Sequence, residues 1–221
     1  MTIQDKKDFA KSNFEECRSL RKIITHQGKG IVSFTSIEKD PAVAGMAVEI
    51  AKALQQQHFK VLIIDTNTVH PEVHEWFMLK NDKGILSEFI EDSASISVNT
   101  VSVLTDGDNA LDVLPCETAP NQRDFLSSNE FKNKILMFKS NYDYVILCLP
   151  PIKDNYETQE LISISDQTYA IVHMLENEFT DVSKALQNLQ LAGNQLDGWV
   201  MVNRKSKEYP YFERLFKWKS K

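Results

Sequence analysis

Three polar residues stand at or near the ends of apolar runs rich in β-branched residues. Ser36 follows the run GIVSFT, Asp65 ends KVLIID, and Cys148 lies in VILCLPP. In open α/β sheets, ligands bind beyond the carboxyl ends of the strands. A carboxylate there caps a helix, anchors a loop or supplies the anionic oxygen that a hard cation or a general base requires. We interpret Cys148 as a small hydrophobe that ends a buried strand, rather than as a nucleophile.

Apolar runs of this kind alternate with helical patterns along the chain. This alternation predicts an α/β fold with a mostly parallel, doubly wound sheet and helices on both faces. The predicted strands are 30–35, 60–65, 110–114, 142–149, 167–175 and 198–203, with 101–104 as a short edge strand. The predicted helices are about 6–25, 41–57, 71–79, 85–91, 129–139 and 178–192.

Composition and charge exclude several classes of protein. The 221 residues carry 25 basic and 31 acidic side chains, and the net charge of −6 argues against a nucleic-acid-binding domain. Three cysteines without C-x-x-C spacing indicate reduced thiols in a cytosol. The amino terminus lacks the apolar core of a signal peptide, and no apolar run is long enough to cross a bilayer. We expect a cytoplasmic protein that reaches the inner face of the membrane only through a partner or a surface contact.

The motifs, taken in order, resemble those of the bacterial tyrosine kinases of polysaccharide export, a branch of the deviant-Walker ATPases that includes the MinD and ParA proteins. The resemblance runs from about residue 14 to residue 203, and it implies one P-loop NTPase-like domain over residues 1–203. The matching segments are E-x-x-R-x-x-R at 15–21, VSFTS at 32–36, VLIIDTNTVHPEVHEWF at 61–77, LDVLP at 111–115, NQRDFLSSNEFKNKI at 121–135 and YDYVILCLPP at 142–151.

The phosphate loop departs from the family pattern. A working loop, G-x-x-x-x-G-K-[ST], needs glycines that turn backbone N–H groups toward the phosphates, a lysine for their charge and a hydroxyl for Mg²⁺. Here Asp40 and Ala42 stand at the glycine places, Val43 replaces the lysine and Ala44 replaces the hydroxyl residue. Asp40 followed by Pro41 is instead typical of an N-cap and the first residue of a helix.

The family's second and third nucleotide-site segments, which follow the predicted strands 60–65 and 142–149, also depart from the family pattern. Asn67 and Val69 replace the second acid and the arginine of the family's D-x-D-x-R pattern, and Cys148 replaces the aspartate of the third segment. An amide lacks the anionic oxygen that Mg²⁺ or a general base requires. We therefore expect no catalytic residue, no metal site and no ATP or Mg²⁺ cofactor.

Three residues match positions that lie around the nucleotide in the resembled family. They are Ser36, Asp65 and Asn203, and Asn203 falls where an adenine-contacting asparagine is expected. The resemblance makes them candidate contacts for a nucleotide without metal. For Asp65, the alternative is a helix cap or a loop anchor at a strand end.

The first predicted helix carries a candidate oligomer interface. Glu15, Arg18 and Arg21 are spaced i, i+3 and i+6, which places them roughly along one helix face. In the resembled family this motif packs one protomer against the next in a ring. Arginine suits such an interface because its planar guanidinium pairs with carboxylates through two hydrogen bonds. The alternative is an exposed helix with a local ion pair.

Residues 204–221 are predicted to form a separate basic, aromatic tail. Kinases of the resembled family carry a tyrosine cluster at the carboxyl end that a neighbour phosphorylates, and this makes Tyr209 and Tyr211 candidate phosphorylation sites. A segment of this composition also suits a contact with an anionic membrane or with a partner. A further alternative is a last helix that packs Phe212, Leu215 and Phe216 on the sheet.

The chain keeps the motif segments of the resembled family but lacks the charged residues of its phosphate and metal sites. This combination predicts a pseudo-kinase that acts by binding. The resemblance implies self-association, or a related kinase or the cytoplasmic tail of a membrane polysaccharide co-polymerase as partner, and a role in capsule or exopolysaccharide synthesis and export. One alternative is an active ATP-dependent tyrosine autokinase that uses substitute residues such as Lys39 and Asp65. Another is a MinD-like positioning protein that contacts the membrane through its tail.

Overall fold

One eight-stranded sheet forms the centre of the protein. The computed structural model describes residues 14–80, 84–85, 101–104, 110–117, 123–153, 155–173, 178–203 and 211–217. The strands are β1 Gly30–Ser36, β2 Val61–Asp65, β3 Val101–Leu104, β4 Ala110–Leu114, β5 Tyr144–Cys148, β6 Gln167–His173, β7 Gly198–Asn203 and β8 Tyr211–Lys217. Their order is β3-β4-β2-β5-β1-β6-β7-β8, and only the β3–β4 and β7–β8 pairs are antiparallel. The predicted, mostly parallel sheet is confirmed.

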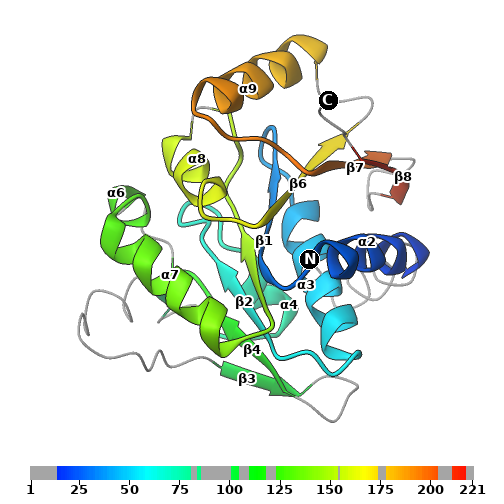
Figure 1. Ribbon diagram of the computed structural model, residues 1–221, viewed down its shortest axis with the longest axis vertical. Coiled ribbons are helices and arrows are strands. Elements are labelled where there is room, and N and C mark those ends of the chain that lie inside the picture. The colour runs from blue at the N-terminus through cyan, green and yellow to red at the C-terminus, as the bar shows by residue number, and fades with distance from the viewer. Residues whose placement is uncertain are drawn as a thin grey trace.

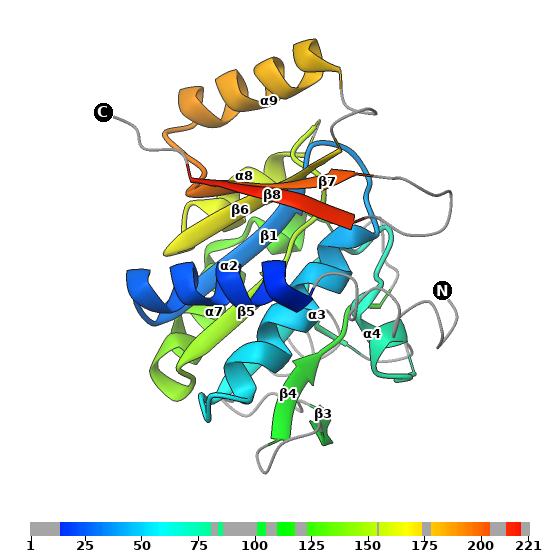
Figure 2. The same cartoon turned by 90° about the vertical axis from the view of Figure 1, so that its right-hand side faces the viewer.

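Helices cover both faces of this sheet. They are α2 Phe14–Gln27, α3 Ala42–Gln55, α4 Val73–Trp76, α6 Arg123–Leu126, α7 Asn129–Asn141, α8 Tyr156–Ile162 and α9 Phe179–Leu191. Helices α2 and α3 lie on one face, and α7, α8 and α9 lie on the other (Figure 1 and Figure 2). Of the predicted helices, residues 86–91 of the helix at 85–91 and the start of the helix at 6–25 lie outside the described residues. Helix α8 was not predicted; Asn155 caps it by accepting a hydrogen bond from the Thr158 N–H.

The central strands have buried side chains on both faces. Every residue of β1, β2 and β5 is buried. Along β1, Val32 and Phe34 pack in the cluster beneath α2 and α3, whereas Ile31 packs in the cluster beneath α7 to α9. Side chains of a strand alternate between the faces, so a strand with a helix layer on each side reads as a continuous apolar run. This burial explains why the strands were predictable.

The carboxyl end of the chain contradicts the predicted separate tail. Residues 211–217 form strand β8, which pairs antiparallel with β7 from Gly198↔Lys217 to Asn203↔Tyr211. The alternative of a last helix is therefore wrong for these residues. Without β8, strand β7 would expose a row of backbone N–H and C=O groups at the sheet edge, and pairing satisfies them. This part of the tail belongs to the sheet, while residues 204–210 and 218–221 lie outside the described residues.

The strand order brings the carboxyl ends of β1, β5 and β2 together. Phe34 and Asp65 are both Cα partners of Cys148, one on each side of β5. The loops after these three strands therefore meet at one place on the sheet. Within the described ranges, no helix combines the length and apolarity that a bilayer crossing requires.

Candidate functional site

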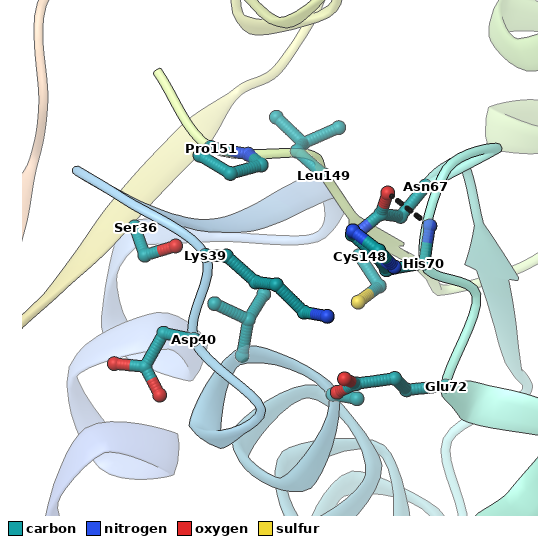
Figure 3. Close-up of a pocket in the computed structure, with 11 residues that line it drawn as sticks. Ser36, Lys39, Asp40, Asn67, His70, Glu72, Cys148, Leu149 and Pro151 are labelled. Atoms are coloured by element: carbon teal, nitrogen blue, oxygen red, sulfur yellow. Dashed lines mark hydrogen bonds between the residues drawn. The ribbon is translucent and has the colours of Figure 1, made fainter. Parts of the chain in front are cut away.

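A small pocket lies where the three loops meet. Its walls include Ser36, Lys39 and Asp40 after β1, and residues of the loops after β2 and β5 (Figure 3). The loop after β5 is bound to β1, because the Thr35 hydroxyl donates to the Pro150 carbonyl at 2.7 Å. Backbone N–H groups of the same loop donate to the carbonyls of residues 34, 36 and 37. The pocket is thus built on the rigid centre of the sheet.

In the loop after β1, polar side chains satisfy the loop's own backbone. The Ser36 hydroxyl donates to the Glu38 carbonyl at 2.6 Å. The Asp40 carboxylate accepts from the Ala42 N–H at 2.9 Å, and the Asp40 carbonyl accepts from the Val43 N–H. Asp40 therefore caps α3, as the sequence predicts, and it provides one of the partners that the first N–H groups of a helix need.

Two residues in the first turn of α3, Val43 and Ala44, pack in the core. The side chains of Val43 and Ala44 are 4% and 1% exposed and belong to the apolar cluster between α3 and the sheet. They are the residues that the sequence analysis predicts at the places of the resembled family's phosphate-binding lysine and hydroxyl. Their side chains offer neither charge nor a hydrogen-bond donor to the pocket.

In the loop after β2, one buried carboxylate organises the backbone. Asp65 is fully buried, and its two oxygens accept from the N–H groups of Asn67, Glu72 and Val73 at 2.9 to 3.0 Å. Burial raises the pKa of Asp65 to about 6, although the three N–H donors oppose this shift. The carboxylate thus acts as a loop anchor, one of the roles that the sequence leaves open for it.

A second carboxyl group, that of Glu72, lines the pocket. Burial raises its pKa to about 7, and the nearby Asp65 carboxylate acts in the same direction. Lys39 acts in the opposite direction and lowers the pKa of Glu72. Figure 3 shows the Lys39 side chain crossing the pocket toward the Glu72 side, while the Asp40 carboxylate points elsewhere.

The segment that ends β5 contributes a thiol to the pocket, and the loop after it carries an ion pair. Cys148 is 4% exposed, and burial raises the pKa of its thiol well above the ordinary value, so the neutral form is favoured. This environment confirms the interpretation of Cys148 as a small buried hydrophobe. In the loop after β5, the Lys153 ammonium pairs with Glu38 at 2.6 Å and with Asp181 of α9 at 3.1 Å.

Proteins described as tyrosine kinases are similar to this chain in sequence, and a solved kinase domain is similar to it in structure. CapB of Staphylococcus aureus is 26% identical over 171 residues, which cover 76% of this chain and 74% of CapB. The tyrosine-protein kinase CpsD of Streptococcus pneumoniae is 25% identical over 170 residues, or 77% of this chain and 74% of CpsD. The solved kinase domain of VpsO superposes with a TM-score of 0.76 at 19% identity, over 91% of this chain and 96% of that domain. No family model matches the sequence.

In sequence the chain is similar to bacterial tyrosine kinases, and it shares the fold of a solved kinase domain. The structure brings two of the three candidate nucleotide contacts to one place. Ser36 lines the pocket and Asp65 lies beside it, in the loop that carries Glu72. Asn203 ends β7, and its side chain lies outside the described part of the protein. Within that part, no cluster of three or more histidine, cysteine or acidic residues has the arrangement of a metal site.

Of the other candidate residues, Glu15, Arg18 and Arg21 are not among those that line the pocket. Glu15 and Arg18 form an exposed ion pair at 3.4 Å on α2, which also carries Arg21. Tyr209 lies outside the described residues, and Tyr211 begins β8. Their roles in assembly and phosphorylation remain predictions.

Sequence reasoning missed Glu72 and His70 as pocket residues, and it missed the ion pairs of Lys153. The only signal was their position within a few residues of a predicted strand end.

Proposed function

We propose that this chain is a non-catalytic member of the bacterial tyrosine kinase family that acts by binding in capsule or exopolysaccharide synthesis and export. The burial of Val43 and Ala44 carries this proposal. A lysine at the first position would add a charge-assisted hydrogen bond to a phosphate, worth roughly 1.5–3 kcal/mol. The valine makes no such bond, and the alanine cannot hold Mg²⁺ through a hydroxyl.

The rest of the loop after β1 also fits Mg²⁺–ATP poorly. Asp40 is a pocket residue, and a carboxylate placed ~4 Å from a phosphate would repel it by about 1–4 kcal/mol between high and intermediate dielectric. Pro41 has no N–H group to offer to a phosphate. We therefore propose that neither ATP nor Mg²⁺ is a cofactor of this protein.

Calorimetry with ATP in the presence and absence of Mg²⁺ tests the proposal. We expect no Mg²⁺-dependent binding with a Kd tighter than about 1 mM, and no transfer of phosphate to tyrosine. An active kinase domain of the family, run in parallel, controls for the assay. A micromolar, Mg²⁺-dependent Kd for this chain would contradict the proposal.

One observation favours the alternative of an active autokinase. The Lys39 ammonium enters the pocket from the loop after β1, as a substitute for the missing lysine would have to do (Figure 3). Under this alternative, Lys39→Ala abolishes the Mg²⁺-dependent binding of ATP. Under the proposed function there is no such binding for the variant to lose, so the same calorimetry separates the two.

We further propose that the exposed face of α2 binds a neighbour, either a second copy, an active kinase of the same system, or the cytoplasmic tail of a membrane polysaccharide co-polymerase. The Glu15 and Arg18 side chains are 76% and 50% exposed. The opposite helix face is buried, through Cys17, Leu20 and Ile24. Light scattering of the protein and of an Arg18→Ala/Arg21→Ala variant tests self-association. We expect the protein to run as an oligomer and the variant as a smaller species, whereas identical masses would exclude this surface as a contact between copies.

A further inference from the structure

The tyrosines whose side chains the structure describes differ sharply in exposure. Tyr156, the first residue of α8, is 64% exposed. Tyr144 and Tyr169 are each 1% exposed. Tyr142 is half-buried, and its hydroxyl donates to the Asp112 carboxylate at 2.8 Å. A phenol accepts a group from another protein's active site only if its oxygen can come within contact distance of the reacting atom there. Among these four tyrosines, Tyr156 meets that condition.

The first turn of α8 holds Tyr156 on an anchored backbone. Asn155 caps the helix by accepting from the Thr158 N–H at 3.3 Å. The Thr158 hydroxyl donates to the carbonyls of Pro150 and Pro151, at 3.2 and 3.3 Å. Pro151 also lines the pocket. The exposed phenol therefore stands at the start of a helix that is fixed to the loop after β5.

An ion pair between α7 and α8 lies beside this phenol. The Tyr156 hydroxyl hydrogen-bonds to the Glu160 carboxylate, one turn further along α8. The same carboxylate accepts from the Lys132 ammonium of α7 at 2.6 Å. The Lys132 and Glu160 side chains are 18% and 24% exposed, so salt screens their attraction less than it screens a fully exposed pair. One carboxylate thus connects the phenol to a cation.

A phosphate on the Tyr156 oxygen would change the balance of this pair. It carries a charge of about −1.5 to −2 and three strong acceptor oxygens at neutral pH. Glu160 repels that charge, whereas the Lys132 ammonium can donate charge-assisted hydrogen bonds to it. The phosphate therefore competes with Glu160 for Lys132, and this competition weakens the link between α7 and α8.

We propose that Tyr156 is a phosphorylation site and that Lys132 is the cation that receives the added phosphate. The phosphoryl donor is ATP bound to an active kinase of the same system, a partner that this inference takes from the proposed function. The step forms a bond between the γ-phosphorus of ATP and the Tyr156 oxygen, breaks the bond to ADP and releases the phenolic proton to water. This site is separate from Tyr209 and Tyr211, which the sequence predicts.

The kinase domain of VpsO, supplied with Mg²⁺ and ATP, serves as the active kinase in the first test. Mass spectrometry of the digested chain locates the phosphate, and phosphorylation of the kinase domain itself shows that the enzyme is active. We expect phosphate on Tyr156, and a lower total of phosphotyrosine in Tyr156→Phe, which removes only an exposed hydroxyl. A chain without phosphate, or with phosphate confined to Tyr209 and Tyr211, would overturn the proposal.

The same reaction without the VpsO domain separates this proposal from the proposed function. We expect no phosphate on the chain when it is incubated with Mg²⁺ and ATP alone. Phosphate on Tyr156 under these conditions would contradict the non-catalytic function, because the chain would then act as its own kinase, but it would support the site.

Phosphorus NMR of the phosphorylated protein tests the role of Lys132. We expect Lys132→Met to raise the second pKa of the phosphate, because this change removes a cation that favours the dianion. Lys139→Met is the matched control, since Lys139 lies on the same helix and pairs at the same distance of 2.6 Å, but with Asp166. It should leave the pKa of the phosphate unchanged. Equal pKa values in both variants and the unmodified sequence would refute the assignment of Lys132.

Discussion

The loop after β1 and the loop after β2 share one pocket but are held in different ways. In the first, Ser36 and Asp40 hydrogen-bond to backbone groups one or two residues away, and the following residues pack into the core. In the second, the buried Asp65 carboxylate accepts from three N–H groups spread over residues 67–73. The side-chain hydrogen bonds of the first loop reach only nearby backbone, whereas in the second loop one buried carboxylate accepts three of them.

This difference shows that polar residues at the ends of strands can serve the fold itself. Helix capping and apolar packing stabilise the loop after β1. The loop after β2 keeps its acid, because removing it would leave several buried N–H groups without an acceptor. A retained aspartate at a strand end is therefore weak evidence for catalysis when its oxygens are already used by the backbone.

Substitution of Asp65 should have the largest effect. Asp65→Ala leaves three N–H groups without an acceptor, and each costs about 1–3 kcal/mol when buried. We expect the free energy of unfolding to fall by about 3 kcal/mol or more, as measured by urea denaturation. Asp65→Asn should lose less, since its amide oxygen still accepts hydrogen bonds. A loss below about 1 kcal/mol for Asp65→Ala would show that this loop does not depend on the carboxylate.

The second prediction concerns pH. The pKa values of Asp65 and Glu72 are raised in the folded state, to about 6 and about 7, so the folded state binds protons more tightly than the unfolded state. The resulting stability is full below about pH 4 and is lost as the pH rises to about 7. Glu72→Gln should reduce the slope of stability against pH between about 4.5 and 7 by at most ~1.4 kcal/mol per unit. Urea denaturation at several pH values measures it, and equal slopes would contradict it.

A smaller effect is expected in the loop after β1. Asp40→Ala removes the cap of α3 and should lower the free energy of unfolding by about 1 kcal/mol. Asp40→Asn is the matched control, because asparagine caps helices about as well and should change stability little. Equal losses in both variants would mean that the charge of Asp40, and not its capping bond, stabilises this loop.

The smallest effect is expected for the exposed ion pairs of Lys153. Lys153→Met breaks exposed ion pairs with Glu38 and Asp181, and such pairs contribute little in water. We expect thermal unfolding to change less than in Asp40→Ala, and the difference to disappear at high salt because salt screens exposed charges. A loss of thermal stability larger than that of Asp40→Ala would show that the ion pairs of Lys153, and not the capping hydrogen bond of Asp40, stabilise the loop after β1.

Much of the fold could be predicted because its signals are local. Strands β4 and β7 begin and end where the apolar pattern predicts, and the predicted cap at Asp40 is confirmed. Strand β8 could not be predicted in this way. Its segment is basic and aromatic, and it becomes a strand because β7 offers an unpaired edge, which is a property of the sheet rather than of the segment.

By itself, the sequence determined the doubly wound sheet and the resemblance to bacterial tyrosine kinases, because these follow from residue types and their order. Only the tertiary structure decided what the remaining polar residues do. Asp65 is fully buried, and Lys39 and Glu72 come to line one pocket from two different loops, only because β1, β5 and β2 end together. Burial and charge at that meeting point depend on all three loops at once, and no local pattern carries this information.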